Sequence, residues 1–566
     1  MDQISRLPYR DSILAIRKDT TMNCVKKWPY YFFMSMSLGA CAGHSNQPTA
    51  DAANSTDDIP KIRNIILMIG DGMGPQQIGL LQDFAKYSKT SVYHNRGTAL
   101  QMFADEGRMA LSSTSPYGAL VADSACSATQ LATGRPALNG VIGLDAQGNT
   151  VQTILEKAKT LGKATGLITD TRITHATPAA FAAHQPHRSE ENAIAIDMIQ
   201  NDVDVLLGGG LRHWIPQHSS SDDAALIALI NDPNFLINSK RIDNRNLLLE
   251  AESMDYTLAF TAQQLEKVTS GKLLGLFSSD AMIDGIAYSN CKAAGTCVEP
   301  SLAEMTKKAL DLLSKDEDGF FLMVEGGQID WAGHSNDAGD LLHQMIKFDE
   351  SVQAVYDWVK DRTDTLVVIT GDHETGGFSF SYSRNEIPEA DSTIAGTGFA
   401  DTSSIYKPSF NFASPDVLDK LYAQKKDFYQ IWHSAGGDFA GKEPTPSALK
   451  NEINNSTAFT VTLAEAKRIL EHEDNHYRVE DHDDLAGEQF PRVDDFEEFY
   501  VYGEEVHLNL IARVLAKHQN TVWSTGTHTH TPVGVISWGP GTAHFEFNGL
   551  TNHVEIGSQL MKLLDK

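Results

Sequence analysis

The chain has 566 residues, of which 41% are hydrophobic, and its formal net charge at pH 7 is −28. A chain of this length and apolar content can bury a large core, so the composition excludes an intrinsically disordered protein. The acidic balance argues against nucleic acid or an acidic membrane face as a partner, because both would repel the chain. It is compatible with a protein that attracts divalent cations.

The amino-terminal residues are typical of a targeting segment. From Met22, two lysines are followed by the apolar run Trp28–Leu38 and then by a Leu-Gly-Ala-Cys sequence that ends at Cys41. This arrangement resembles a bacterial lipoprotein signal, in which the cysteine is lipidated after cleavage. The alternative is an ordinary secretory signal that is cut nearby. Either signal predicts an exported protein, in the periplasm or anchored to the outer membrane of a Gram-negative bacterium.

The targeting segment sets the first boundary in the domain organisation. We expect residues 1–41 to be the targeting segment, residues 42–60 a flexible tether rich in Ser, Asn, Asp and Ala, and residues 61–566 the folded domain. Past the signal the sequence has no run of about 20 apolar residues, which a spanning helix would need. Cys291 and Cys297 lie in a loop-like segment and form either a local disulfide or a free pair, whereas Cys126 is expected to be a small packing residue.

Short apolar runs alternate with amphipathic stretches along the folded part of the chain. The apolar runs predict buried parallel strands at Ile65–Ile69, Lys163–Thr169, Val203–Leu207, Phe320–Val324, Leu366–Thr370 and Val533–Trp538. The amphipathic stretches predict helices at Thr153–Thr160, Glu190–Gln200, Leu302–Leu313, Leu341–Val359 and Ile556–Leu564. This alternation predicts an α/β fold, with a doubly wound, mostly parallel central sheet and helices on both faces.

A large insertion interrupts this alternation at about residues 379–522. It contains three apparent helices, Pro415–Trp432, Leu463–His472 and Phe496–His518. Insertions of this length commonly form a lid, a subunit interface or a second small domain. We therefore expect a cap or crown above the sheet.

Acidic and histidine residues gather in five short motifs, which we place where strands end. The motifs span Met68–Gly74, Val121–Ala125, Glu325–His334, Thr370–Glu374 and Thr527–His530. In an open α/β sheet the carboxyl ends of the strands form the ligand-binding edge. Carboxylate and imidazole ligands that converge there from distant segments predict a multinuclear metal site.

Two motifs offer groups that suit phosphate. Ser124 is expected at the start of a helix, where backbone N–H groups face an anion, although Asp123 or Ser124 could simply cap that helix. Thr177 is expected to be the N-cap of a helix that follows His175. The Arg188 guanidinium can bind two phosphate oxygens, although a single arginine near a helix end is often a solvated surface charge.

The remaining motifs are richer in metal ligands. Asp330 and His334 have the i, i+4 spacing that puts two ligands on one helical face, and Asp372 and His373 are adjacent after a strand. Mixed carboxylate and imidazole groups suit zinc, whereas oxygen-only sets suit magnesium. The oxygen donors in question are those of Asp71, Thr177 and Glu325.

In this order, over about Lys61–Lys566, the motifs resemble those of the alkaline phosphatase family. The resemblance implies that Ser124 is the phosphorylated nucleophile and that Arg188, thirteen residues after His175, is the phosphate clamp. It implies that one zinc is bound by Asp330, His334 and His528. It implies that a second zinc is bound by Asp71, Asp372 and His373, and magnesium by Asp71, Thr177 and Glu325. His528 is preferred to His530 because it stands eleven residues before the Gly539-Pro540 pair, as the family ligand does.

Two positions differ from the enteric bacterial pattern. His175 stands where that pattern has an aspartate beside magnesium, and Trp331 stands where it has a lysine. Together with the large insertion, these residues resemble the marine Vibrio-type enzymes. Because an acid and a positive charge are lost, we expect weaker magnesium and phosphate binding and faster product release.

The resemblance implies hydrolysis of phosphate monoesters to an alcohol and inorganic phosphate, through a phosphoserine at a site with two Zn²⁺ and one Mg²⁺. It also implies a homodimer with the insertion at the interface, and the alternative is that the insertion forms a cap on a monomer. The expected partners are small phosphate monoesters, and the lipoprotein-like signal implies contact with the membrane only through a lipid anchor at Cys41. A sulfatase, phosphodiesterase or mutase of the same superfamily is the alternative, but residues 124–129 lack the Cys-x-Pro-x-Arg of sulfatases. A non-catalytic binding lipoprotein would be expected to lack a ligand or the nucleophile.

Overall fold

The computed structural model describes residues 62–94, 96–232, 235–394, 396–399, 405–503, 505–540, 542 and 549–565. The expected targeting segment with Cys41, the tether and Lys61 lie outside the described residues. In the part of the chain that the structure describes, we find no helix with both the length and the apolar character needed to cross a membrane. Cys291 and Cys297 form a disulfide, and Cys126 is a free, buried cysteine.

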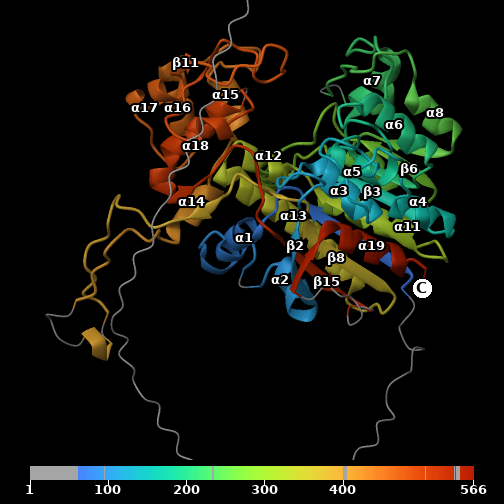
Figure 1. The fold of residues 1–566 in the computed structure, drawn as a ribbon, viewed down its shortest axis with the longest axis horizontal. Helices are drawn as coiled ribbons and strands as arrows, with labels where there is room; N and C mark the ends of the chain where they lie inside the picture. The colour runs from blue at the N-terminus through green and yellow to red at the C-terminus, as the bar shows by residue number, and fades with distance from the viewer. Residues whose placement is uncertain are drawn as a thin grey trace, which may run out of the picture. The chain divides into compact units, whose positions relative to one another are not determined.

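A ten-stranded sheet forms the centre of the described residues, in the order β16-β2-β15-β8-β1-β7-β3-β4-β6-β5 (Figure 1). Its strands are β1 (Asn64–Gly70), β2 (Arg108–Ser113), β3 (Ala164–Arg172), β4 (Val205–Gly209), β5 (Tyr256–Ala259), β6 (Lys272–Leu276), β7 (Phe320–Gly326), β8 (Thr365–Gly371), β15 (Val533–Trp538) and β16 (Gly549–Asn552). The mostly parallel, helix-covered sheet confirms the expected fold class. One expected strand direction is wrong, because β15 runs antiparallel to both of its neighbours, β2 and β8.

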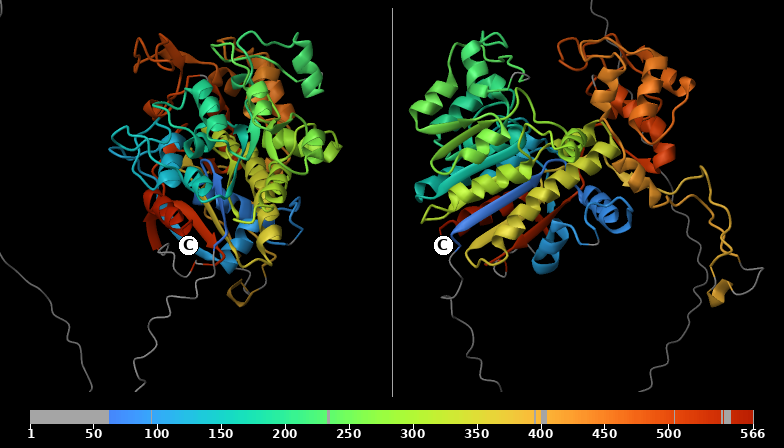
Figure 2. Two further views of the ribbon diagram at one scale, coloured as in Figure 1. Left: turned by 90° about the vertical axis from the view of Figure 1, so that its right-hand side faces the viewer. Right: turned by 180° about the vertical axis from the view of Figure 1, so that it is seen from behind.

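Helices cover both faces of the sheet (Figure 2). The side chains of β1 alternate between two apolar cores, with Ile66 and Met68 in one core and Ile65, Leu67 and Ile69 in the other. The first core also contains residues of α1 (Pro75–Tyr87), α2 (Ala99–Glu106), α11 (Leu302–Leu313) and α13 (Ala338–Val359). The second contains residues of α3 (Ser124–Thr133), α4 (Ile154–Thr160), α5 (Ala176–Ala182), α6 (Glu191–Gln200) and α19 (His553–Leu563). A strand that is buried on both faces reads as a continuous apolar run, which is why the sequence revealed it.

The insertion forms a group of short helices whose apolar core is continuous with that of α13 (Figure 1). Its elements are α14 (Asp416–Tyr422), α15 (Phe428–Ser434), α16 (Pro446–Ser456), α17 (Leu463–Ile469), α18 (Val506–Gln519) and a hairpin of β11 (His472–Asp474) with β12 (Gln489–Pro491). The single helix expected over Pro415–Trp432 is wrong. Asp427 accepts a hydrogen bond from the Gln430 N–H and caps a new helix there, so the chain breaks into α14 and α15.

Candidate metal centre and nucleophile

The adjacent strands β1, β7 and β8 place the carboxylates of Asp71, Glu325 and Asp372 at one edge of the sheet. Asp71 follows β1, which lies between β7 and β8, and Gly70 is in register with Gly326 of β7 and Gly371 of β8. Asp372, directly after β8, is therefore a close neighbour of Asp71. Because β15 is antiparallel, its first residues lie at this same edge, and so does His528, which precedes β15 in the short strand β14 (His528–Thr529).

Asp330, His334 and His528 form the first group of possible metal ligands. Asp330 and His334 are one turn apart on α12 (Gln328–His334), with the His334 Nε2 atom 3.3 Å from Asp330 Oδ2. The His528 Nε2 atom lies 3.5 Å from Asp330 Oδ1 and 3.0 Å from His334 Nε2. The Nδ1 atoms donate to the carbonyls of Gly526 and Ala122, so both Nε2 atoms face the group.

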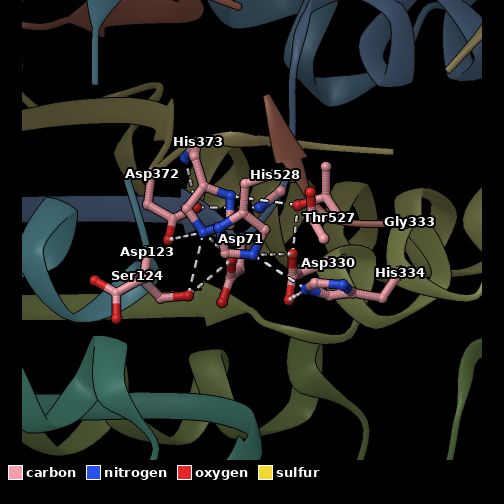
Figure 3. A network of polar contacts seen from close by, with 12 residues as sticks. Asp71, Asp123, Ser124, Asp330, Gly333, His334, Asp372, His373, Thr527 and His528 are labelled. Carbon is pink, nitrogen blue, oxygen red and sulfur yellow. Dashed lines mark hydrogen bonds and ion pairs between the residues drawn. The ribbon is translucent and has the colours of Figure 1, made fainter. Parts of the chain in front are cut away.

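Asp71, Asp372 and His373 form a second group, which is fully buried and lies beside Ser124. The His373 Nε2 atom is 3.5 Å from Asp71 Oδ1 and 3.3 Å from Asp372 Oδ2. The Ser124 hydroxyl lies 3.2 Å from His373 Nε2 and 3.5 Å from Asp71 Oδ1. Figure 3 shows the serine turned toward these two residues, on the opposite side of the network from His334.

Asp71, His175 and Glu325 form a third group. Thr177 is buried near the start of α5, on the helix that His175 caps. Among the described residues, no hydrogen-bond partner is found for either carboxylate oxygen of Glu325, for Oδ2 of Asp71 or for the Thr177 hydroxyl. Buried polar atoms normally have partners, so these atoms fit a set of cation ligands rich in oxygen.

The electrostatics of the three groups also fit bound cations. Burial and the neighbouring Asp372 and Asp330 hold the pKa of Asp71 well above its usual value. Burial raises the pKa of Glu325 to about 8, and burial followed by the charge on His373 lowers the pKa of His528 to about 3. Despite burial, the neighbouring Asp330 raises the pKa of His334 to about 9, so a cation bound there would displace a proton from this imidazole. Crowded carboxylates and neutral imidazoles are the ligand forms that divalent cations stabilise.

The Ser124 hydroxyl is not used to cap α3. The Asp123 carboxylate caps α3 by accepting from the Cys126 N–H at 3.0 Å, so the capping alternative is satisfied by Asp123. This motif does not follow a strand, as we expected it to, because β2 ends at Ser113 and a loop separates it from α3.

The Asp123 carboxylate also fixes Arg188. Its Oδ2 atom accepts from the Gly140 N–H at 3.0 Å and lies 3.3 Å from Nη1 of Arg188. Nη2 of Arg188 donates to His175 Nε2 at 3.1 Å. Arg188 is thus held between the serine helix and the third ligand group. Sequence reasoning missed this role of Asp123, although its position beside Ser124 was a usable signal.

The structure also places Thr177, Trp331 and His530, which the sequence had singled out. The N-cap of α5 is His175, and Thr177 lies inside the helix, so Thr177 as N-cap is wrong. Trp331 is half-buried and its ring stands edge-on to that of His175, with centroids 6.1 Å apart. Among the described residues His530 belongs to no ligand group, and it pairs with the Ser115 hydroxyl at 2.9 Å.

The insertion contributes residues that sequence reasoning did not find. Asn509 of α18 donates to the His334 carbonyl at 2.6 Å, and the Glu505 carboxylate lies 3.8 Å from Nδ1 of His334. The ring of Tyr502 stands edge-on to the His334 ring at 5.2 Å. These contacts cross long sequence separations, so no local pattern indicates them. The insertion therefore forms one wall around the first ligand group.

The fold and the ligand groups together define a metal-binding hydrolase built on a doubly wound α/β sheet. The chain belongs to the alkaline phosphatase family, whose model matches residues 62–428, and it is a phosphomonoester hydrolase. It is 29% identical over 545 residues to alkaline phosphatase 3 of Bacillus subtilis, covering 95% of this chain and 97% of that protein. It is 31% identical over 363 residues to the alkaline phosphatase of Escherichia coli, covering 57% of this chain and 72% of that protein.

Solved structures show the same fold. The cold-active alkaline phosphatase of a psychrophilic Shewanella species matches with a TM-score of 0.61 and 26% identity, over 89% of this chain and all 100% of that chain. The Thermus thermophilus alkaline phosphatase matches with a TM-score of 0.68 and 24% identity, over 92% of this chain and 95% of that chain. The second likeness concerns the fold alone.

Proposed function

We propose that this phosphomonoesterase acts through a phosphoserine at Ser124. The observation that carries the proposal is the position of the Ser124 hydroxyl, at the amino end of α3 and within 3.5 Å of both His373 and Asp71. Asp123, and not the serine, caps the helix, so the Ser124 oxygen can attack phosphorus. Backbone N–H groups at a helix start also favour an anion.

We further propose that the three ligand groups hold two Zn²⁺ and one Mg²⁺. Asp330, His334 and His528 would bind one zinc, and Asp71, Asp372 and His373 the other. Magnesium would be bound by Asp71, Thr177 and Glu325. When bound, such cations lower the pKa of a nearby hydroxyl or water and stabilise negative charge on phosphoryl and leaving-group oxygens. The unpaired buried oxygens of Asp71 and Glu325 support this assignment.

In the proposed reaction Ser124 is the nucleophile, and Arg188 binds the phosphate. The Ser124 oxygen forms a bond to phosphorus while the ester P–O bond breaks, and the alcohol leaves with its oxygen. Water then attacks the phosphoserine, inorganic phosphate departs and the serine hydroxyl is restored. Arg188 binds two phosphate oxygens with its guanidinium, and Asp123 orients that guanidinium from 3.3 Å.

His175 and Trp331 adjust how tightly phosphate is held. Burial and the neighbouring Arg188 keep the pKa of His175 well below its usual value, so this side chain adds no positive charge. Trp331 likewise contributes an uncharged ring beside His175. We infer that phosphate is retained mainly by Arg188 and the cations, and that product leaves faster than it would beside a lysine.

An acid-quench experiment tests the proposed intermediate. The holoenzyme is mixed with an excess of an aryl phosphate monoester, quenched in acid within milliseconds and digested for mass spectrometry. We expect phosphate on the peptide that contains Ser124, and none after mixing with the matching sulfate ester. Phosphate on another residue, or turnover with no phosphopeptide at any quench time, would contradict the proposal. The matching diester serves as a second control for a phosphodiesterase.

The cellular setting and the assembly are part of the same proposal. We propose that residues 1–41 direct export to the periplasm or outer membrane of a Gram-negative bacterium, that Cys41 carries a lipid anchor, and that residues 42–60 tether the catalytic domain, 61–566. We also propose a homodimer with the 379–522 insertion at the interface. The exposed rings of Tyr382, Phe410 and Phe412 form one aromatic cluster in this insertion, which supports a second copy of the chain as its partner.

A further inference from the structure

A fourth cluster of metal-ligand side chains lies inside the insertion, apart from the groups around Ser124. Glu443 precedes α16, His472 begins β11 and His507 lies in the first turn of α18. Figure 1 shows α16, α17, β11 and α18 gathered in one group. The Glu443 Oε1 atom is 3.0 Å from His472 Nε2 and 3.2 Å from His507 Nε2. Three segments that are separate in sequence therefore aim one ligand atom each at a common point.

His507 is held in the orientation that a metal ligand needs. Its Nδ1 atom lies 2.9 Å from the carbonyl oxygen of Ile469. A carbonyl oxygen can only accept, so Nδ1 carries the proton and the Nε2 lone pair points toward Glu443. The ring is buried and stacks on Trp432 with centroids 4.7 Å apart and an interplanar angle of 17°. The imidazole is thus fixed before any cation arrives.

The distances in this cluster can be compared with those in the first ligand group near Ser124. There, His334 and His528 lie 3.3 and 3.5 Å from Asp330 through Nε2, and both donate Nδ1–H to a backbone carbonyl. Ligands of a tetrahedral zinc with bonds of 2.0–2.1 Å are about 3.3 Å apart. The distances from Glu443 to the two histidines fall close to that value, and His507 repeats the backbone contact.

We propose that Glu443, His472 and His507 form a further divalent-cation site, of the class that binds zinc. Two imidazoles and one carboxylate favour a transition metal over calcium or magnesium, which take oxygen ligands. Glu443 and His472 are each about one-third exposed, with side-chain accessibilities of 34% and 32%, so a cation and one water can enter from solvent. The proposal does not depend on the reaction at Ser124.

The cation would act as a clip within the insertion. It would join α18 to the segments that carry Glu443 and His472. The same helix carries Asn509, whose side chain donates to the His334 carbonyl. A cation that fixes the start of α18 therefore stabilises the wall of the insertion beside the first ligand group. His472, Glu443 and His507 would be positioning residues for that wall.

The metal content of the full-length holoenzyme tests the proposal. The parent, His472→Ala and Glu443→Gln are equilibrated with the same excess of zinc, desalted and analysed for zinc by mass spectrometry. We expect each variant to hold one zinc per chain less than the parent. The proposed zinc ligands around Ser124 are unchanged in all three proteins, so a difference of one zinc per chain is assigned to this cluster. Equal zinc content in the parent and both variants would overturn the proposal and leave a simple His–Glu ion pair.

His476→Ala is the matched control. His476 is another histidine of the insertion, its Nδ1 atom is 3.1 Å from Glu497 Oε1, and no second imidazole belongs to a ligand group with it among the described residues. We expect this variant to hold as much zinc as the parent. A loss equal to that of His472→Ala would show that any broken His–Glu pair loosens metal elsewhere, and would refute the assignment.

Amide hydrogen exchange provides a second test. It remains informative if His472→Ala folds poorly, because it compares the parent with Glu443→Gln. Glu443→Gln is a near-isosteric change at an exposed position, so the insertion should keep its structure. Zinc added to the parent should slow amide exchange at the start of α18 and in β11, and this protection should be absent from Glu443→Gln. Equal protection by zinc in the parent and in Glu443→Gln would contradict the proposal.

Discussion

The position of the Ser124 hydroxyl depends on the acid that precedes it. Asp123 caps α3 through one carboxylate oxygen and accepts from Gly140 and Arg188 through the other. One residue therefore satisfies the helix start and fixes Arg188, the proposed phosphate clamp. Among the described residues, the Ser124 hydroxyl has His373 and Asp71 as its hydrogen-bond partners. At this scale the chemistry depends on which of two adjacent side chains takes the capping role.

Removing the Ser124 hydroxyl should abolish the covalent route. We expect Ser124→Ala to lower kcat for an aryl phosphate by roughly 10³-fold or more, about 4 kcal/mol, because only direct attack by water remains. Zinc and magnesium contents should match the parent, since the carboxylates and imidazoles of the three ligand groups are unchanged. Ser115→Ala, which removes a hydroxyl bonded to His530, is the control. Turnover close to that of the parent would remove Ser124 as the nucleophile.

Shortening Arg188 should mainly affect the binding of phosphate. We expect Arg188→Ala to raise KM and the inhibition constant of inorganic phosphate by about 10- to 100-fold, in line with the loss of charge-assisted hydrogen bonds. Steady-state kinetics with phosphate as inhibitor measures both constants. Arg188→Lys keeps the charge without the bidentate geometry and should give intermediate values. Loss of bound zinc from Arg188→Ala would indicate a structural role instead.

A positive charge at position 331 should slow product release. Trp331 lies beside His175, which in turn accepts a hydrogen bond from Arg188, so a lysine there would approach the bound phosphate. We expect Trp331→Lys to lower the inhibition constant of inorganic phosphate several-fold and to reduce kcat at alkaline pH. Trp331→Gln, which loses the ring without gaining charge, separates the two effects. An unchanged inhibition constant in Trp331→Lys would contradict this role for the tryptophan.

At the scale of elements, α13 joins the sheet to the insertion through His343. Its ring stacks on Tyr422 of α14 with centroids 4.8 Å apart, donates to the Tyr422 carbonyl at 3.0 Å and pairs with the Ser289 hydroxyl at 2.8 Å. Burial lowers the pKa of this imidazole to about 4. The folded protein thus holds His343 neutral, whereas the unfolded chain takes up a proton near pH 6.5.

This pKa shift makes the contact acid-sensitive. Its stabilising contribution is complete above pH 6.5 and is lost as the pH falls toward 4, because the unfolded chain binds the proton first. With a folded pKa of about 4, the contact loses about 2 kcal/mol between pH 7 and pH 5. We expect His343→Gln to be less stable at pH 7 but to lose about 2 kcal/mol less of its unfolding free energy over that range. Urea unfolding at both pH values measures this, and identical losses in the two proteins would contradict it.

At the scale of the whole molecule, the helices of the insertion bury an apolar core within the chain itself. Leu418, Leu421, Phe428 and Trp432 are at most 4% exposed, in the core shared with α13. The exposed aromatic cluster of Tyr382, Phe410 and Phe412 differs, with exposures of 62%, 42% and 58%. A contiguous exposed cluster of this kind is typical of an interaction surface, and in a homodimer both copies contribute it.

Breaking the aromatic cluster should therefore break the dimer. We expect the parent to have twice the mass of one chain at micromolar concentration and Phe410→Ser/Phe412→Ser to have the mass of one chain, as measured by sedimentation equilibrium. Leu236→Ser, which changes an exposed apolar residue outside the insertion, should remain dimeric. A parent that is already monomeric at this concentration would refute the dimer, whatever the variants do.

Some features of this protein could be read from the sequence because they are local. β1, β7 and β8 are buried on both faces and appear as continuous apolar runs, and the i, i+4 spacing of Asp330 and His334 follows directly from helical geometry. The family motifs and the clustering of acids and histidines after strands also needed no tertiary information. The sequence therefore determined the fold class, the reaction class and the choice of candidate ligands.

Tertiary structure decided what depends on contacts between distant segments. The antiparallel direction of β15 follows from the path the chain takes after the insertion, and that direction brings His528 to Asp330 while His530 turns to Ser115. Asp123 rather than Ser124 caps α3, and the grouping of Glu443 with two histidines requires three separate elements to meet. The physical reason is the same each time. A side chain's partners are set by packing in space, whereas local sequence fixes only the element on which that side chain lies.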